Sequence, residues 1–130
     1  MNQFAFILFY LFVAPFQMSE QVIAEKADPN VLIGTWKLDM SPENQTDGNF
    51  AMMRIEKIKN GSFKGVFYRE GVKIRKGRIN TQTGVIHGAL VSGDNSGDYN
   101  TSFYLKEGKL YGTTHSLSRD FLSVWVATKE

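Results

Sequence analysis

From residue 30 to the C-terminus, short stretches of alternating apolar and polar residues are separated by Gly or Asn at about ten-residue intervals. Alternation with a period of two is typical of strands that are buried on one face. No stretch keeps the 3.6-residue apolar period of an amphipathic helix. The pattern predicts eight strands, over residues 33–39, 50–58, 62–69, 72–79, 85–92, 99–106, 109–115 and 121–128.

The links between these strands are short and carry turn residues. Asn60-Gly61, Glu70-Gly71 and Glu107-Gly108 suit tight hairpins, because glycine accepts the positive φ of such turns, and the longest loop covers residues 41–49. Consecutive strands are therefore expected to pair antiparallel. The predicted fold class is all-β, an eight-stranded antiparallel up-and-down meander barrel, which removes both sheet edges. A two-sheet sandwich is the alternative. The interior of such a barrel holds side chains or one small ligand.

Alternation also predicts which side chains point inward. The last strand is apolar on both faces, with Phe121 and Trp125 on one and Leu122, Val124 and Val126 on the other. Such a strand is typically covered on both faces, so its outer surface is expected to meet another subunit or the N-terminal segment, unless the register is wrong. The residues expected to face the interior are Trp36, Leu38, Met53, Ile55, Phe63, Phe67, Val72, Ile74, Val85, Ala89, Phe103 and Leu105.

The first two dozen residues differ from the rest. Residues 4–16 are uncharged and rich in Phe and Leu, too short to span a bilayer but as long as the apolar region of a signal peptide. Cleavage after Ala24 or Ala27 is expected. The predicted organisation is a signal peptide over 1–24, an N-terminal arm over 25–31 and one barrel domain over 32–130, in a secreted or periplasmic protein. A buried helix or an uncleaved anchor is the alternative.

Composition narrows the function classes. The 130 residues are 42% hydrophobic and contain no cysteine, which excludes disulfides, thiolate metal sites and cysteine nucleophiles. The formal charge is only +2, but nine basic and two acidic residues lie between positions 54 and 78, a net charge of +7. This basic stretch is either a solvated face or a surface for an anionic partner such as a polysaccharide, lipid headgroup or nucleic acid.

Four segments carry a family resemblance. Gly34-Thr35-Trp36 at the first strand, residues 60–67 (NGSFKGVF), residues 76–80 (KGRIN) and residues 121–128 (FLSVWVAT) occur in this order. They resemble the calycin barrels, which include the lipocalins and the avidin and streptavidin group. The resemblance implies a small β-barrel with an open mouth, and it places Trp125 where the avidins have a biotin-stacking tryptophan.

The rest of the biotin site does not carry over. The avidins have a polar amide soon after the first Trp, where this chain has Lys37 and Leu38, and Tyr and Ser after the Gly of the third strand, where it has Phe67 and Arg69. Thr113, Thr114 or Ser116 are the remaining matches. The ureido group of biotin needs several converging hydrogen bonds, so tight biotin binding is not expected.

No catalytic motif is present, and the chain is not predicted to be an enzyme. His87 and His115 are 28 residues apart and lack a third ligand for a metal, so no metal or cofactor is expected. Pairing of His115 with Asp120, or of His87 with Asp94, as an acid–base unit is the alternative to ordinary strand histidines. The densest polar segment, Thr113–Asp120, lies in the last hairpin, at one mouth of the barrel.

The first hypothesis is an exported, non-enzymatic barrel that binds a small, partly apolar ligand in its mouth. A self-associating chain with no nucleic-acid partner and no stable membrane insertion is expected. The second hypothesis is a protein-binding module, such as an inhibitor of a secreted hydrolase, which would use residues 25–30 as an extended arm and have a filled interior. The residues expected to bind the ligand are Trp36, Phe67, Phe103, Thr114, His115, Ser123 and Trp125.

Overall fold

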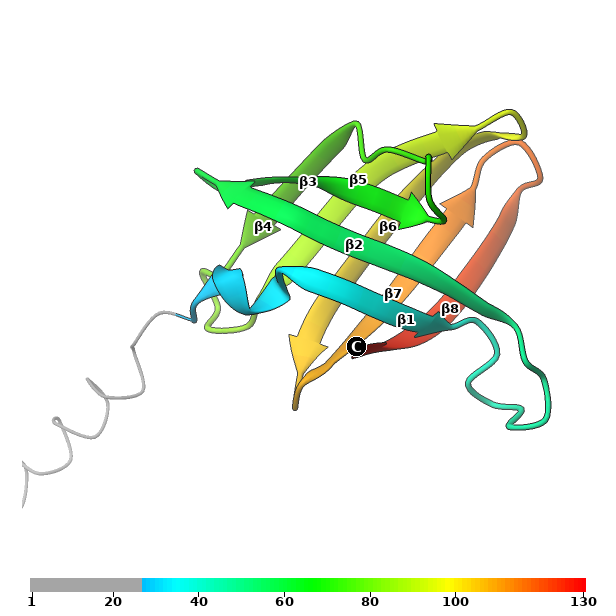
Figure 1. The fold of residues 1–130 in the computed structure, drawn as a ribbon, viewed down its shortest axis with the longest axis horizontal. Helices are drawn as coiled ribbons and strands as arrows, with labels where there is room; N and C mark the ends of the chain where they lie inside the picture. The colour runs from blue at the N-terminus through cyan, green and yellow to red at the C-terminus, as the bar shows by residue number, and fades with distance from the viewer. Residues whose placement is uncertain (1–26) are drawn as a thin grey trace, which may run out of the picture.

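A computed structural model describes residues 27–130, so the predicted signal peptide and the first two residues of the predicted arm lie outside the described residues. One short 3-10 helix precedes eight strands (Figure 1). Within residues 27–130, no helix is long and apolar enough to cross a membrane. The elements are η1 (Pro29–Leu32), β1 (Gly34–Asp39), β2 (Phe50–Lys59), β3 (Ser62–Tyr68), β4 (Lys76–Asn80), β5 (His87–Asp94), β6 (Gly97–Lys106), β7 (Lys109–Ser116) and β8 (Phe121–Lys129).

The sheet closes on itself. Each strand pairs antiparallel with the next, and β1 also pairs with β8, from Trp36 opposite Lys129 to Asp39 opposite Val126. The prediction of an all-β, up-and-down, eight-stranded barrel is therefore confirmed, and this closed meander is compatible with a calycin-like fold. Within residues 27–130, closure pairs the first strand with the last, so neither is an exposed sheet edge.

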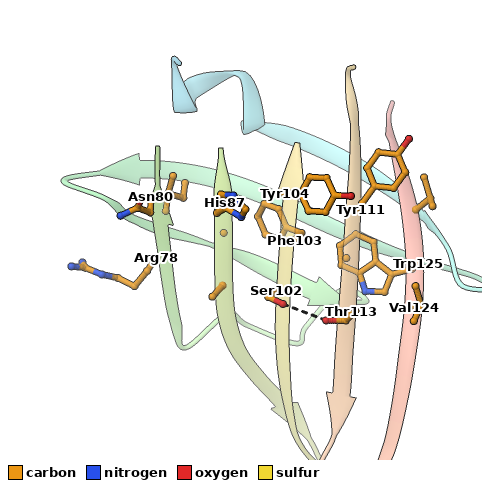
Figure 2. A pocket seen from close by; sticks show the side chains of 15 residues that line it. Arg78, Asn80, His87, Ser102, Phe103, Tyr104, Tyr111, Thr113, Val124 and Trp125 are labelled. Atoms are coloured by element: carbon orange, nitrogen blue, oxygen red, sulfur yellow. Dashed lines mark hydrogen bonds between the residues drawn. The ribbon is translucent and has the colours of Figure 1, made fainter. Parts of the chain in front are cut away.

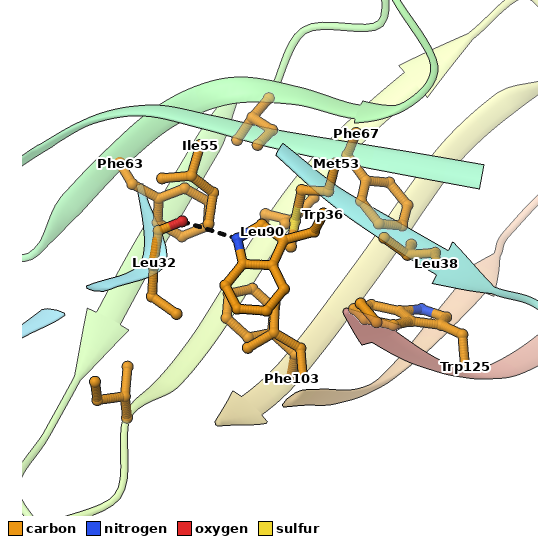
Figure 3. Close-up of a cluster of buried hydrophobic side chains, with 14 residues drawn as sticks. Leu32, Trp36, Leu38, Met53, Ile55, Phe63, Phe67, Leu90, Phe103 and Trp125 are labelled. Carbon is orange, nitrogen blue, oxygen red and sulfur yellow. Dashed lines mark hydrogen bonds between the residues drawn. The ribbon is translucent and has the colours of Figure 1, made fainter. Parts of the chain in front are cut away.

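The two ends of the barrel differ. At one end, the Asp28 side chain accepts a hydrogen bond from the Asn30 N–H and caps η1, and Leu32 is fully buried. The Trp36 indole N–H donates to the Leu32 carbonyl at 2.8 Å, which fixes η1 against β1 (Figure 3). This is the closed end. Residues 40–49, 69–75, 95–96 and 117–120 form the loops at the opposite end, which we call the mouth.

Two glycines make room for the largest core side chains. Phe103 lies directly between Gly88 and Gly112, and Gly112 is in turn opposite Trp125. A Cβ on Gly88 would lie 2.3 Å from the Phe103 ring, and one on Gly112 would lie 2.3 Å from Cζ2 of Trp125. The rings therefore occupy the space that side chains at these positions would need.

The predicted strands are correct to within about two residues, apart from the fourth and the face of the fifth. The fourth begins at Lys76 rather than at residue 72, and the preceding residues keep only the isolated bridge between Val66 and Lys73. In the fifth strand, Val85 and Ala89 were expected inside, but they are exposed, and the opposite face is buried. That strand is apolar on both faces, so alternation alone does not decide its phase. The buried face is Ile86, Gly88, Leu90 and Ser92.

Gly112→Ala tests the glycine–aromatic packing. We expect a loss of about 1–3 kcal/mol in the free energy of unfolding, because the fully buried Trp125 has no room to move away from the new methyl group. Gly48→Ala, where the nearest atom is 4.0 Å away, is the matched control and is expected to change stability by less than about 0.5 kcal/mol. Chemical denaturation measures both. An equal loss in the free energy of unfolding for both variants would contradict the close packing of Trp125 against Gly112.

Candidate functional site

The mouth of the barrel contains a cavity of about 460 Å³. Its wall is built from inward-facing residues at the mouth ends of β3, β6 and β7 and from residues 121–124 of β8, and its rim from the loops. This is the size range of a small-molecule site. The lining residues are Met40, Ser41, Glu43, Asn49, Tyr68, Tyr99, Thr114, Ser116, Arg119, Phe121, Leu122, Ser123 and Val124.

The strand register places the polar residues in rows across the inner wall. Thr101, Thr114 and Ser123 are directly opposite one another on β6, β7 and β8. In the next row toward the mouth, Ser92, Tyr99 and Ser116 are likewise opposite one another on β5, β6 and β7. Small hydroxyl side chains thus replace the large apolar ones found deeper in the barrel, and this replacement leaves space.

The deeper polar row is satisfied by its own hydrogen bonds. The Thr101 and Thr114 hydroxyls are 2.9 Å apart, and the Trp125 indole N–H donates to the Thr114 hydroxyl at 3.0 Å. Trp125 is fully buried, and its ring lies 6.1 Å from that of Phe67 and 6.5 Å from that of Phe103. This network holds a rigid aromatic floor beneath the cavity.

The outer polar row is not satisfied. The hydroxyls of Ser92 and Ser116 are buried and have no hydrogen-bond partner among the residues that the structure describes. A buried hydroxyl without a partner costs about 1–3 kcal/mol, so such groups are uncommon and call for an explanation. Ser116 lines the cavity, so a bound molecule that offers a donor or an acceptor would remove this cost.

An aromatic pair forms one wall of the cavity. The rings of Tyr68 and Tyr99 are stacked, with centroids 5.9 Å apart and an interplanar angle of 22°. Tyr68 has a φ of +93°, which is unusual for a bulky residue and is found mainly where the surrounding structure holds a side chain in a required position. In this protein, the residue with this φ is the one whose ring stacks on Tyr99 at the mouth.

A carboxylate fixes the orientation of this wall. The Tyr99 hydroxyl donates to the Asp94 carboxylate at 3.0–3.1 Å, and Arg69 forms an ion pair with it at 3.0 Å. Hydrogen bonds from the Ser96 hydroxyl and backbone N–H, followed by those from Tyr99 and Arg69, lower the pKa of Asp94 to about 2. Asp94 is therefore charged at neutral pH, and it ties the β5–β6 turn, β6 and the β3–β4 loop together.

The residues predicted to bind a ligand fall into four groups. Thr114 and Ser123 line the cavity, and Trp125, Phe67 and Phe103 lie beneath it in the core. Trp36 is at the closed end, where its N–H bonds to Leu32, and it does not line the mouth. His115 is on the outer face of β7, where its Nε2 lies 2.9 Å from the Asp120 carboxylate, and it does not line the cavity either. Alternation accounts for this, since the neighbouring Thr114 points inward.

The sequence-based site did not include Tyr68 and Tyr99, which line the cavity, or Ser92, which is opposite Tyr99 in the outer polar row. The alternation pattern is sufficient to predict that Tyr99 faces the interior, because Tyr99 shares its face of β6 with the inward-facing Phe103. The pattern is not sufficient for Tyr68, because its positive φ interrupts the alternation that places neighbouring residues on opposite faces. Ser92 was hidden by the uncertain phase of the fifth strand.

No protein-family model matches this chain, and no curated protein sequence matches it either. The chemistry of the mouth must therefore be inferred from its own residues. Within residues 27–130, no three His, Asp or Glu side chains come together as metal ligands.

Asp94→Asn tests the anchoring of the wall. Because the pKa of Asp94 falls from 3.8 to about 2 on folding, the charged carboxylate contributes stability above about pH 4 that is lost as the pH falls toward 2. We expect the variant to be less stable than the wild type at pH 7, and the difference to shrink toward pH 2. Thermal unfolding by circular dichroism at pH 7, 4 and 2 measures this.

Asp47→Asn is the matched control, since its exposed carboxylate makes no side-chain hydrogen bond or ion pair within the described chain. It is expected to follow the wild type at each pH. A constant gap between wild type and Asp94→Asn from pH 7 to pH 2 would contradict the anchoring role.

Proposed function

We propose that this protein is an exported, non-enzymatic binding protein that holds a small, partly apolar ligand in the mouth of its barrel. The observation that carries the proposal is Ser116, which lines a cavity of about 460 Å³ and whose buried hydroxyl lacks a hydrogen-bond partner within residues 27–130. A ligand with one polar group directed at Ser116 satisfies this hydroxyl. Such a combination of an apolar wall with a few placed polar groups is typical of small-molecule sites.

The lining restricts the chemistry of the ligand. Tyr68 and Tyr99 offer stacked aromatic surface, and Phe121 stands at the rim with 60% of its surface exposed. A ring or short apolar body suits this wall, with a neutral hydroxyl or carbonyl group pointing down toward Ser116. Full charges are confined to the rim, at Glu43 and Arg119, so a charged head at the floor would lack a counter-ion.

Kinship with the avidins or lipocalins is part of the proposal. The closed meander and the tryptophan beneath the mouth support it, and the segments of residues 34–36, 60–67 and 121–128 resemble those families. Biotin is not the proposed ligand, because Phe67 is buried in the core and Arg69 is engaged by Asp94. A secreted or periplasmic location, proposed from residues 4–16, accompanies this function.

The alternative of a hydrolase inhibitor has less support. It called for an extended arm before the barrel and a filled interior. The described part of that segment instead leads into η1, which is packed at the closed end through Leu32, and the mouth contains a cavity.

Ser116→Ala tests the ligand site. The probes are 2-pyrrolidinone, cyclohexanone, cyclohexanol and phenol, titrated by ligand-observed NMR. At least one is expected to bind the wild type, and the variant is expected to bind it about 2- to 12-fold more weakly, the equivalent of one lost hydrogen bond. The thermal stability of the free variant should be unchanged or higher, because the removed hydroxyl has no protein partner.

His115→Ala is the matched control, since His115 is the next residue along but lies on the outer face. It is expected to keep the affinity of the wild type. Absence of binding by all four probes, or the same loss of affinity in both variants, would contradict the mouth as the binding site.

We also propose that the outer face of β5–β8 binds a second copy of this chain. This face has a concavity of about 720 Å³ (Figure 2), and two rows of side chains cross the strands around it. One row is Ala89, Ser102, Thr113 and Val124, and the other is His87, Tyr104, Tyr111 and Val126. The rows contain no Lys, Arg, Asp or Glu, although Arg78 of β4 also lines the concavity, and the rings of Tyr104 and Tyr111 are stacked at 5.5 Å. Interface cores are depleted in charge and rich in Tyr, and a dimer about a two-fold axis uses one such surface twice.

Val124→Lys tests self-association. Val124 is 58% exposed on this face, so a lysine there is tolerated by the monomer but places a charge in the dimer interface. Size-exclusion chromatography with light scattering is expected to give a dimer for the wild type and a monomer for the variant. Gln82→Lys, which adds the same charge in the exposed 81–86 turn, should remain dimeric. A monomeric wild type at every concentration would contradict the proposal.

A further inference from the structure

Another concavity lies on the neighbouring part of the outer surface, over β3, β4 and the segment between them, and it shares the lining residue Arg78 with the concavity over β5–β8. Its volume is about 850 Å³, and its floor is formed by Phe63, Val66 and Ile74, which are all buried. We call it the basic groove. The basic residues that line it are Arg54, Lys64, Lys73, Arg75, Lys76 and Arg78.

The acidic residues of the groove are already paired. Arg54 binds both Glu56, at 3.1 Å, and Glu70, through two contacts of its guanidinium, and these are the two carboxylates in the lining. Arg75 is paired with Asp98 at 2.7 Å. Pairing within the protein therefore neutralises one side of the groove and leaves the other side cationic.

Four cations remain without an acidic partner within residues 27–130. Lys64, Lys73 and Lys76 make no ion pair there, and Arg78 donates only to the Ser62 hydroxyl, at 2.7 Å. All four are exposed. Lys76 and Arg78 are two residues apart on β4, which places their side chains on the same face at a spacing of about 7 Å.

The neighbouring strand adds a like-charge pair. Lys57 of β2 is directly opposite Lys64 of β3. Two cations facing each other across a strand pair are destabilising, and a bound anion removes this repulsion. The sheet thus maintains an unfavourable charge arrangement beside the groove that an anionic partner would make favourable.

The apolar residues decide which kind of anion fits. Phe63 and Phe67 are buried, and Tyr68 lies in the mouth, so the groove offers no exposed aromatic ring for stacking of nucleic-acid bases. Large exposed apolar side chains that could enter a membrane, such as Phe121 and Leu122, are on β8 rather than beside the cations. The partner that fits best is therefore an anionic polymer with charges at intervals, which needs neither base stacking nor membrane insertion to bind.

We propose that the basic groove binds an anionic polysaccharide, whose carboxylate or sulfate groups contact Lys64, Lys73, Lys76 and Arg78. The groove is on a different side of the barrel from the mouth and shares no lining residue with it, so this proposal does not depend on the small-molecule site.

The probe is dextran sulfate, with uncharged dextran as the reference, and fluorescence anisotropy of the labelled polymer measures binding to the whole protein. At 50 mM salt, the protein is expected to bind dextran sulfate and not uncharged dextran. The double variant Lys73→Glu/Lys76→Glu should bind at least tenfold more weakly. Its slope of log K against log salt should be shallower by about 1.5–2, because two cations no longer release counter-ions.

Lys106→Glu/Lys109→Glu is the matched control, with the same change of charge in the β6–β7 hairpin at the closed end. It is expected to stay within about twofold to threefold of the wild type. Lys64→Gln/Arg78→Gln serves as a second groove variant, and thermal unfolding checks that every variant is folded. Equal losses in groove and control variants would assign the binding to overall charge and overturn the proposal.

Single-stranded DNA and anionic phosphatidylserine vesicles are tested at the same salt. Tighter binding to either of them than to dextran sulfate would assign the groove to nucleic acid or to a membrane surface, and it would equally contradict the proposal.

Discussion

The narrow interior of an eight-stranded barrel constrains everything else in this protein, and the packing of two aromatic rings against two glycines shows how closely it is filled. Phe103 lies between Gly88 and Gly112, and Trp125 covers Gly112. Larger residues at the glycine positions would displace the rings. The rings fill the middle of the barrel, while Leu32 and Trp36 fill its closed end.

The same constraint gives the mouth its chemistry. Where the inward-facing residues change from Phe and Trp to Ser and Thr, the wall no longer fills the interior, and a cavity results. The Thr114 hydroxyl is already used by Thr101 and Trp125, whereas the buried hydroxyl of Ser116, another residue that lines the cavity, has no hydrogen-bond partner within residues 27–130. On the outside, cations without an acidic partner within residues 27–130 lie over β3 and β4, whereas two rows of uncharged side chains cross β5–β8.

The sequence was sufficient for the fold because its turns are short and its alternation is regular over most strands. It was insufficient where side chains of similar polarity occupy both faces, as in residues 85–92, whose phase is decided by Gly88 packing against Phe103. Of the residues predicted to bind a ligand, Thr114 and Ser123 line the mouth cavity, whereas Trp36 and His115 do not. The strand pattern alone does not show which end of a barrel a residue reaches or which way a residue next to a turn points.

The central claim is that a small ligand enters the mouth and rests above Trp125. The most direct measurement follows the two indole N–H signals in ¹H–¹⁵N NMR spectra during titration with the fragment that binds best. Trp125 donates to Thr114 beneath the cavity, whereas Trp36 donates to Leu32 at the closed end. The account predicts that the Trp125 signal shifts with ligand concentration while that of Trp36 stays in place. A shift confined to Trp36, or no shift of either signal under saturating ligand, would contradict it.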